Sequence, residues 1–555
     1  EARQEEYPDK TAFLQLLNQL LRHDRLTRRD RHAMQRMGSD INVPPDVWPY
    51  ASFVVADILE RVDQRPYKCA GDRWRVARPA LRAVLQLLRM GTHALTTGTL
   101  PLDTANQTHV PRAPTAIGDV PGAEETQNAT PLTHEMTGIR LCQLLLQSSP
   151  LLKRILAILN YAVDNLAIER SLDGGEDLED CVLSCLRMIL LVLEHQEAVL
   201  ALQLTLASGT HSAWRWATSQ LLTPLHRLLE LHRSHIVMLA RYIEYPYSSL
   251  INTLSVRIVH SLATQEELNV KMVRLVVESE LQQRLIAAYV EHLERVEANP
   301  IDTNRELFNT HEEDEDLEEE ESDIALSTQD AVRAAILSLM IDCARQPAPN
   351  LAQLLIGVAP VLVSTHTPSK GHTQVRTTST HTILEALVSH VLRQPEALRA
   401  CPRVLALGHQ LLHTLLSERS TQLRTTTYLR SMERHHDFFH AQLEFFTSLD
   451  TPQEFEDSTE RTDIMDISER SKRSNMTSRQ WQQLLEARGW FLKTLALELH
   501  TTRGSGYRPY SGKLVALLFS TSDAQREDET EQSIAQAPTP HTIKMKALLD
   551  VLEVP

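Results

Sequence analysis

The densest group of side chains that could bind a metal ion consists of His435, His436 and His440. His436 and His440 lie four residues apart, so on a helix both imidazole rings would project from the same face. A zinc-protease helix needs the sequence H-E-x-x-H, which does not occur anywhere in the chain. The neighbouring Phe438 and Phe439 instead favour a helix that packs aromatic rings, with the histidines at its edge. We therefore predict that this group binds no metal.

Two further groups could bind a ligand, and both have a simpler structural interpretation. His409 and His413 repeat the four-residue spacing but lie among leucines, which favours a packed helix over a metal site. Trp214 and Trp216 flank Arg215. Packing of these rings in a core or in a groove between helices is favoured over an aromatic cage for a cation.

Phosphate-binding and nucleophile motifs are missing from the chain. The sequence contains no G-x-x-x-x-G-K-[ST], no G-x-G-x-x-G and no G-x-S-x-G. With 17 glycines in 555 residues, it has little means to build a phosphate cradle or a nucleophile elbow. We expect no catalytic residue, no cofactor and no metal ligand, and we therefore predict that the protein is not an enzyme.

The composition is typical of a helical protein of the nucleus or cytosol. Apolar residues make up 42% of the chain and aromatic residues 5%, so helix formers dominate over strand formers. The net charge of −16 is unfavourable for phosphate contacts, and we expect no direct binding of nucleic acid. Six scattered cysteines suit a reducing compartment. No apolar run reaches the roughly 18 residues that a membrane-spanning helix needs, so we expect no membrane insertion.

Amphipathic helices recur along the whole sequence. Ser149 and Pro150 open one of them as N-cap and first helical residue, and a broad apolar stripe follows. Thr223–Pro224 and Pro402 open two more. Further helices are predicted at residues 13–21, 47–62, 76–90, 178–193, 250–262, 281–296, 331–344, 382–392, 481–500 and 513–519. Because no convincing alternating strand pattern occurs, the predicted fold class is all-α.

Polar, proline-rich or acidic stretches separate the helices into segments. Helical solenoid segments are predicted at 1–90, 139–297 and 331–555, with a flexible insertion at 91–138, an acidic disordered loop at 298–330, and loops at 364–381, 450–478 and 520–541. The run EEDEDLEEEESD at 312–323 is interpreted as a solvated loop, with a docking site for a basic partner as the alternative. Successive helices with surface insertions predict an extended α-solenoid of degenerate HEAT- or armadillo-like repeats.

The stretch PAPNLAQLLIG at 347–357 places Asn350 and a series of leucines directly after a proline. It is similar to a Pro-Asn-Leu-Ala-x-x-Leu-Leu-x-Gly helix start and so resembles the large inner-ring scaffold nucleoporins, the nucleoporin 205/192 family. Asn350 is expected to cap the helix, and Leu351, Leu354 and Leu355 are expected to be buried.

Two later stretches resemble the same family, and fainter likenesses keep the same order upstream. TTYLRSMERHHDFFHAQLEFF matches at Tyr428-Leu429-Arg430, Phe438-Phe439 and Gln442-Leu443, and GWFLKTLALELH matches at Trp490, Leu492, Lys493, Thr494, Glu498 and Leu499. The upstream likenesses are YPDKTAFLQLLNQLL, DRWRVARPALRAVLQLLR and ARYIEYPYSSLINTLSVRIVHSL. The order is kept from about Tyr7 to about Leu552.

The resemblance implies a structural role in the inner ring of the nuclear pore complex, at the nuclear envelope. It implies that the protein supports nucleocytoplasmic transport by binding linker nucleoporins through their short linear motifs, together with other inner-ring subunits. Family members are much longer, so the chain is expected to be an internal portion. The alternatives are a karyopherin-like transport receptor and another HEAT-like adaptor, since both are also α-solenoids.

Overall fold

The computed structural model describes nine stretches of the chain and a few residues beyond them. These stretches are residues 7–22, 49–98, 134–208, 222–295, 328–358, 382–393, 401–436, 438–447 and 478–504, with Gly512, Leu514 and Val515 in addition. The chain divides into two compact units, the first ending at Leu262 and the second starting at Ala263. Each unit is described separately below. No strand occurs in the described part, where every regular element is an α-, 3-10 or π-helix.

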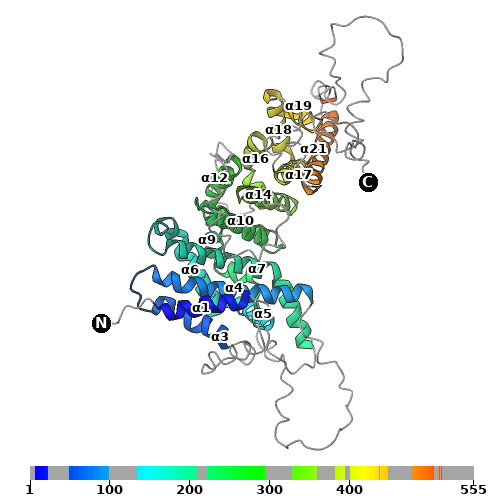
Figure 1. Ribbon diagram of the computed structural model, residues 1–555. Coiled ribbons are helices and arrows are strands. Elements are labelled where there is room, and N and C mark those ends of the chain that lie inside the picture. Colours follow the sequence, from blue (N-terminus) through cyan, green and yellow to red (C-terminus); the bar gives the residue numbers. More distant parts are fainter. Residues whose placement is uncertain are drawn as a thin grey trace, which may run out of the picture. The chain divides into compact units, whose positions relative to one another are not determined.

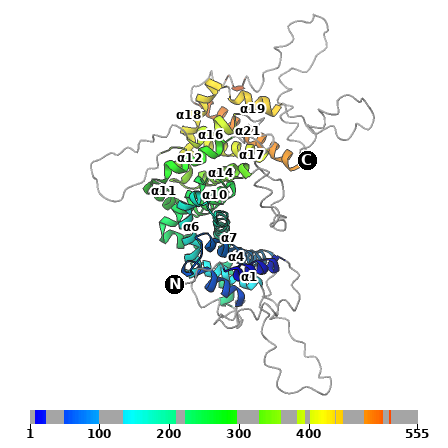
Figure 2. The ribbon, with the colours of Figure 1, turned by 60° about the vertical axis from the view of Figure 1, so that its left-hand side comes forward.

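Unit 1 is a stack of helices in which each packs against its neighbours (Figures 1 and 2). Its elements are α1 (Pro8–Arg22), α3 (Pro49–Ser52), η1 (Phe53–Leu59), η2 (Val62–Gln64), α4 (Asp72–Thr97), α5 (His134–Leu145), α6 (Pro150–Glu169), α7 (Gly175–Ser208), α8 (Leu225–Leu231), α9 (Arg233–Arg241), η5 (Tyr242–Glu244) and α10 (Ser249–Ala263). Helix α4 contacts α1, α5 and α7, and α6 contacts α7 and α9. The core of unit 1 is therefore shared along a row of helices.

The predicted start of α6 is confirmed. Ser149 has an extended backbone, and its hydroxyl accepts a hydrogen bond from the Leu152 N–H, while Pro150 occupies the first helical turn. The cap stabilises the helix by about 1 kcal/mol. The stripe predicted after it is buried at Leu151, Leu152, Ile155, Leu156, Ile158 and Leu159, and half-buried at Val163.

The single helix predicted after Thr223–Pro224 is wrong, because the chain forms two. Pro224 is itself the N-cap of α8, and the helix ends at His232, whose φ of −122° and ψ of 78° are not helical. Helix α9 then starts at Arg233. Leu229 and Ile236 lie seven residues apart, so they fall on nearly the same face with or without a break. The apolar spacing therefore could not reveal it.

Helix α4 is longer than predicted and lies very close to α5. It continues past Met90 to Thr97, where Gly98 ends it in the left-handed conformation at φ 66°. A Cβ on Gly138 of α5 would lie 1.9 Å from the Leu87 carbonyl oxygen, so glycine is required at this crossing. The stretch from Gly91 to Thr97 has a loop-like composition, but its contacts with α5 keep it helical.

Unit 2 is a second helical stack, with α17 at its centre (Figure 1). Its elements are α11 (Asn269–Glu278), α12 (Leu281–Glu294), α14 (Thr328–Arg345), α15 (Leu351–Leu355), α16 (Ile383–Ala386), η7 (Leu387–Val391), α17 (Pro402–Ser417), α18 (Arg419–His436), α19 (Phe438–Thr447) and α21 (Ser478–Gly504). Helix α17 contacts α14, α18 and α21. The predicted start of α17 is confirmed, since Pro402 lies in its first turn after the N-cap Cys401.

Two predicted helices change their winding partway along. The stretch predicted at 47–62 starts as α3 and continues as the π-helix η1. The stretch predicted at 382–392 starts as α16 and continues as the π-helix η7. Apolar spacing alone does not separate α- from π-winding over so few residues, because both bury residues three to five positions apart.

The all-α solenoid prediction is confirmed by the helical stacks of both units. Most of the stretches predicted as insertions, and nearly all of the helix predicted at 513–519, lie outside the described residues. Trp214, Arg215, Trp216 and the acidic run at 312–323 lie outside them as well. None of the described helices is long and apolar enough to cross a membrane.

Candidate functional site

The candidate site lies at one edge of unit 1, where α4 starts, α6 ends and α7 starts. A tight turn joins α6 to α7: the Leu172 N–H donates to the Glu169 carbonyl, and the Gly175 N–H donates to the Leu172 carbonyl. Gly174 has a φ of 88°, and a Cβ on it would lie 2.6 Å from the Gly71 Cα. These glycines let the α6–α7 turn contact the start of α4 through backbone atoms.

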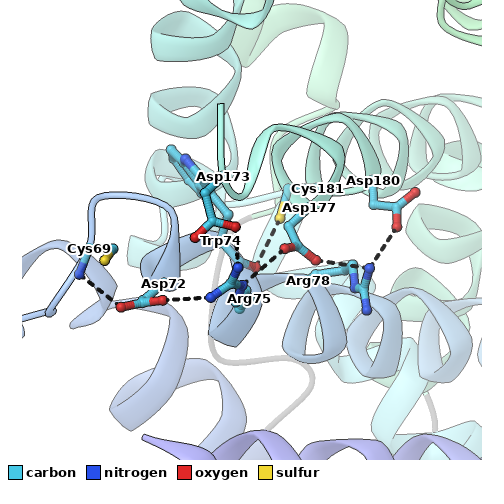
Figure 3. A network of polar contacts seen from close by, with 9 residues as sticks. All are labelled: Cys69, Asp72, Trp74, Arg75, Arg78, Asp173, Asp177, Asp180 and Cys181. Carbon is cyan, nitrogen blue, oxygen red and sulfur yellow. Dashed lines mark hydrogen bonds and ion pairs between the residues drawn. The ribbon is translucent and has the colours of Figure 1, made fainter. Parts of the chain in front are cut away.

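A ladder of ion pairs runs from this edge along the contact between α4 and α7 (Figure 3). Arg75 pairs with Asp72 at 3.0 Å, and it also pairs with Asp173. Arg78 lies 2.9 Å from Asp177 and 3.4 Å from Asp180. The ladder is closed by Arg82, which lies 3.0 Å from Asp180.

The ladder sets the register between α4 and α7 more than it stabilises them. The side chains of Arg75, Arg78 and Arg82 are 45%, 34% and 33% exposed, so water screens each pair. A single exposed pair contributes about 0–1 kcal/mol. A slide of one helix along the other would break several pairs together, which favours one alignment.

Beneath the ladder the contact is apolar and aromatic. Cys181 is fully buried, with its Sγ 3.8 Å from the Trp74 carbonyl oxygen. Burial raises the pKa of the Cys181 thiol well above its ordinary value, so the thiol stays protonated and is a poor nucleophile. The Arg73 guanidinium lies 4.2 Å from the Trp74 ring and 4.5 Å from the Tyr161 ring.

A hollow of about 430 Å³ opens beside the ladder, bordered by Arg75, Arg170 and the 171–177 turn. Arg170 lies 4.5 Å from the Tyr247 ring, and its Nε lies 3.9 Å from Glu179. Leu172 in the turn is 61% exposed. The hollow is thus lined mainly by charged and polar groups, with Leu172 as an exposed apolar side chain at its border, which suits binding of a partner better than bond chemistry.

His409 and His413, two of the histidines that could have held a metal, lie in packed surroundings. His409 is fully buried and packs against the rings of Phe446 and Phe491, at centroid distances of 5.5 and 5.6 Å. Its neighbour His413 lies 5.3 Å from the Trp490 ring. Within the described residues, no three His, Cys, Asp or Glu side chains are placed to share a metal ion. The side chains of His435 and His436 lie outside the described part, and His440 is exposed.

Burial decides the protonation of His409. Its Nε2–H donates to the Gln442 Oε1 at 3.1 Å, and its buried Nδ1 has no hydrogen-bond partner. Burial lowers the pKa of His409 to about 3, because a charged ring would lose its hydration. His409 is therefore a neutral core residue at physiological pH.

The stretches singled out for their family resemblance come together in unit 2. Asn350 and Gln353 form the expected capping box at the start of α15. Arg424 of α18 donates through Nε to the Ile356 carbonyl at 2.9 Å, which joins the first stretch to the helix of the second. Arg430 of the second stretch lies 2.6 Å from Glu498 of the third.

The ion-pair ladder of unit 1 is the part of the site that sequence reasoning missed. Its signature is present: the arginines lie at spacings of three and four on α4, and the aspartates Asp173, Asp177 and Asp180 at spacings of four and three. The arginines share one face of α4, and the aspartates run from the α6–α7 turn into the first turns of α7. Only the fold shows that the two series meet, because about a hundred residues separate them along the chain.

Helices that stack in rows and leave long surfaces open to partners are typical of α-helical scaffold proteins. The profile of the nuclear pore complex scaffold family, nucleoporins 186/192/205, matches residues 1–555. The chain belongs to this family. The suspected family resemblance is thus confirmed, as are the nuclear pore complex and the nuclear envelope as the protein's location.

One curated relative is similar over nearly the whole chain. The human nuclear pore complex protein Nup205 is 24% identical over 550 residues, which cover 96% of this chain and 23% of the relative. The chain therefore spans about a quarter of the length of that relative.

Proposed function

We propose that the protein is a structural subunit of the inner ring of the nuclear pore complex. In this role it supports nucleocytoplasmic transport by binding linker nucleoporins through their short linear motifs, and by contacting other inner-ring subunits. The match of a scaffold family to the whole chain is the observation on which this proposal depends. It also favours this function over a karyopherin-like receptor, and we propose no catalytic activity.

The architecture suits this role for a physical reason. Helices in each unit contact mainly their neighbours, so stability accumulates along a stack and long surfaces stay available for partners. An extended or helical segment binds such a surface through a few apolar anchors, while flanking charges adjust specificity.

A recovery experiment tests the proposed function. The chain is immobilised, incubated with nuclear-envelope extract, and compared with a variant that lacks residues 312–323. We expect both versions to recover the same linker nucleoporins, which would make the acidic run dispensable for binding. Recovery of Ran and transport cargo without nucleoporins would instead support the transport-receptor alternative.

We also propose that the helical segments predicted at 1–90, 139–297 and 331–555 are separated by insertions that a protease can reach. Helices α4 and α5 narrow the first insertion to the residues between Gly98 and His134. Limited proteolysis followed by mass spectrometry should give first cuts there and between Arg295 and Thr328. First cuts inside α4 or α7 would contradict the proposed segments.

A further inference from the structure

The exposed side chain of Leu172 borders the hollow at the α6–α7 turn, and two further exposed apolar residues, Ile168 and Tyr247, lie near the border residue Arg170 in the chain or in space. Ile168 is 69% exposed, Leu172 is 61% exposed and Tyr247 is 48% exposed. Isolated apolar residues on a surface are ordinary, but a cluster with a polar rim marks interaction sites.

Tyr247 is held beside the border of the hollow. The guanidinium of the border residue Arg170 lies 4.5 Å from the Tyr247 ring. The Tyr245 ring packs edge-on against Tyr247 at 5.6 Å, and the Tyr245 hydroxyl donates to Glu179 of α7 at 3.0 Å. Ile168 and Leu172 each lie two residues from Arg170 along the chain.

The charges at the hollow favour a cationic partner. Its border contains the carboxylates of Asp173, Glu176 and Asp177 and the guanidiniums of Arg75 and Arg170. Arg75 pairs with Asp173 and Asp177 on this border, and Arg170 lies 3.9 Å from Glu179 of α7. The border carboxylates outnumber the guanidiniums, the side chain of Asp173 is 67% exposed and Glu176 is exposed, so a net negative charge faces the solvent. Opposite charge on a partner would be attracted and like charge repelled.

We propose that the α6–α7 edge binds a linear segment of a partner nucleoporin that packs an apolar side chain against Leu172 and places a Lys or Arg beside Asp173 and Glu176. This inference rests on the proposed function, because it assumes that the chain binds linear motifs of other nucleoporins. The edge selects for basic motifs with an apolar anchor.

The same charges argue against two other occupants. A second copy of the chain on a two-fold axis would bring the same acidic edge against itself, since such an interface pairs identical patches. The acidic run at 312–323 would place further carboxylates beside Asp173 and Glu176. Both arrangements bring like charges together and would weaken binding.

Site-specific cross-linking identifies the segment that binds there. A photoreactive phenylalanine analogue is introduced at Leu172, and in a control chain at Leu204, which is 73% exposed near the far end of α7, the 34-residue helix that follows the turn. After exposure to nuclear-envelope extract, mass spectrometry determines which peptides are joined. We expect Leu172, but not Leu204, to cross-link to a nucleoporin segment with an apolar residue next to Lys or Arg. No cross-link, an acidic segment, or another copy of this chain would overturn the proposal.

Affinity measurements then test the chemistry with the identified segment as a synthetic, fluorescently labelled peptide. We expect Leu172→Asp to weaken binding roughly tenfold and Glu176→Lys severalfold, because the first removes an anchor and the second reverses an attraction. Leu204→Asp should leave the affinity unchanged. All three positions are exposed, so circular dichroism and thermal unfolding should match the unaltered chain. Equal affinities for all variants would overturn the proposal.

The recovery experiment separates failure of this inference from failure of the proposed function. If Leu172→Asp recovers linker nucleoporins as well as the unaltered chain does, motifs bind elsewhere and only the inference fails. If the unaltered chain recovers no linker nucleoporin, the proposed function fails with it.

Discussion

The contact between α4 and α7 in unit 1 and the core around α17 and α21 in unit 2 are built in opposite ways. The first is rimmed by exposed Arg–Asp pairs that share partners along a ladder. The second buries Phe439, Phe446 and Phe491 around a neutral histidine. At the α4–α7 contact, unit 1 thus uses polar contacts to set the alignment of the two helices, whereas unit 2 uses aromatic packing to gain stability.

Substitution of Phe491 has the largest expected effect and tests whether aromatic packing stabilises unit 2. Its ring is fully buried and stacks on Phe446 at a centroid distance of 5.4 Å. We expect Phe491→Ala to lower the free energy of unfolding of unit 2 by about 3 to 5 kcal/mol, through lost burial and the cavity left behind. Hydrogen exchange of the α17 and α21 amides measures it. The matched control Leu423→Ala, at a side chain that is 80% exposed, should change exchange little.

The Arg430–Glu498 pair provides a second test of the comparison, because it is an ion pair within the core of unit 2. The Glu498 side chain is 1% exposed and the Arg430 side chain 17% exposed. Glu498→Ala should lower the free energy of unfolding by about 3 kcal/mol, since Arg430 loses the buried carboxylate 2.6 Å away. The double variant Arg430→Met/Glu498→Leu should recover most of that loss in denaturant unfolding. A double variant as unstable as Glu498→Ala would show that the pair itself, not the charge left on Arg430, matters.

His409 predicts a pH dependence confined to unit 2. Burial lowers the pKa of His409 to about 3 in the folded state, while the ring titrates near 6.5 when unfolded. The unfolded state binds more protons between these values, so stability is lost as the pH falls below about 6.5. At pH 5 the loss attributable to His409 is about 2 kcal/mol.

Comparison of the unaltered chain with His409→Gln isolates this contribution. We expect unit 2 of the variant to lose less stability between pH 7 and pH 5, as measured by hydrogen exchange of α17. The α4 amides of unit 1 should respond alike in both proteins. Parallel pH profiles for α17 in the two proteins would exclude His409 as the source.

Substitution of a ladder residue has the smallest expected effect and tests whether the ion pairs of unit 1 set alignment more than they add stability. We expect Arg78→Ala to lower stability by less than about 1 kcal/mol, because its pairs with Asp177 and Asp180 are partly solvated. The loss should shrink further at high salt, which screens the remaining charges. Denaturant unfolding at low and high salt measures both effects. A loss as large as that of Phe491→Ala would overturn the assignment of the ladder to alignment.

Much of the local structure of this protein, above all the helix starts, could be predicted from the sequence. Ser149, Asn350 and Pro402 predicted helix starts because caps and first-turn prolines act within one helical turn. Apolar stripes likewise predicted an all-α chain. The candidate site could be predicted from the sequence only in part. Most of its residues are charged side chains of the kind found on any helix surface, and no motif indicated that Leu172 or Tyr247 would be exposed.

Which helix faces contact each other is visible only in the tertiary structure. It ended α8 at His232, carried α4 to Thr97 against α5, and brought Arg75 to Asp173 and Arg430 to Glu498. Those choices depend on packing between residues far apart in the chain. Intrinsic preferences of a few tenths of a kcal/mol per residue are easily overridden by burial worth several times more. Local rules therefore indicate where many helices start, and packing decides where some of them end and how they pair.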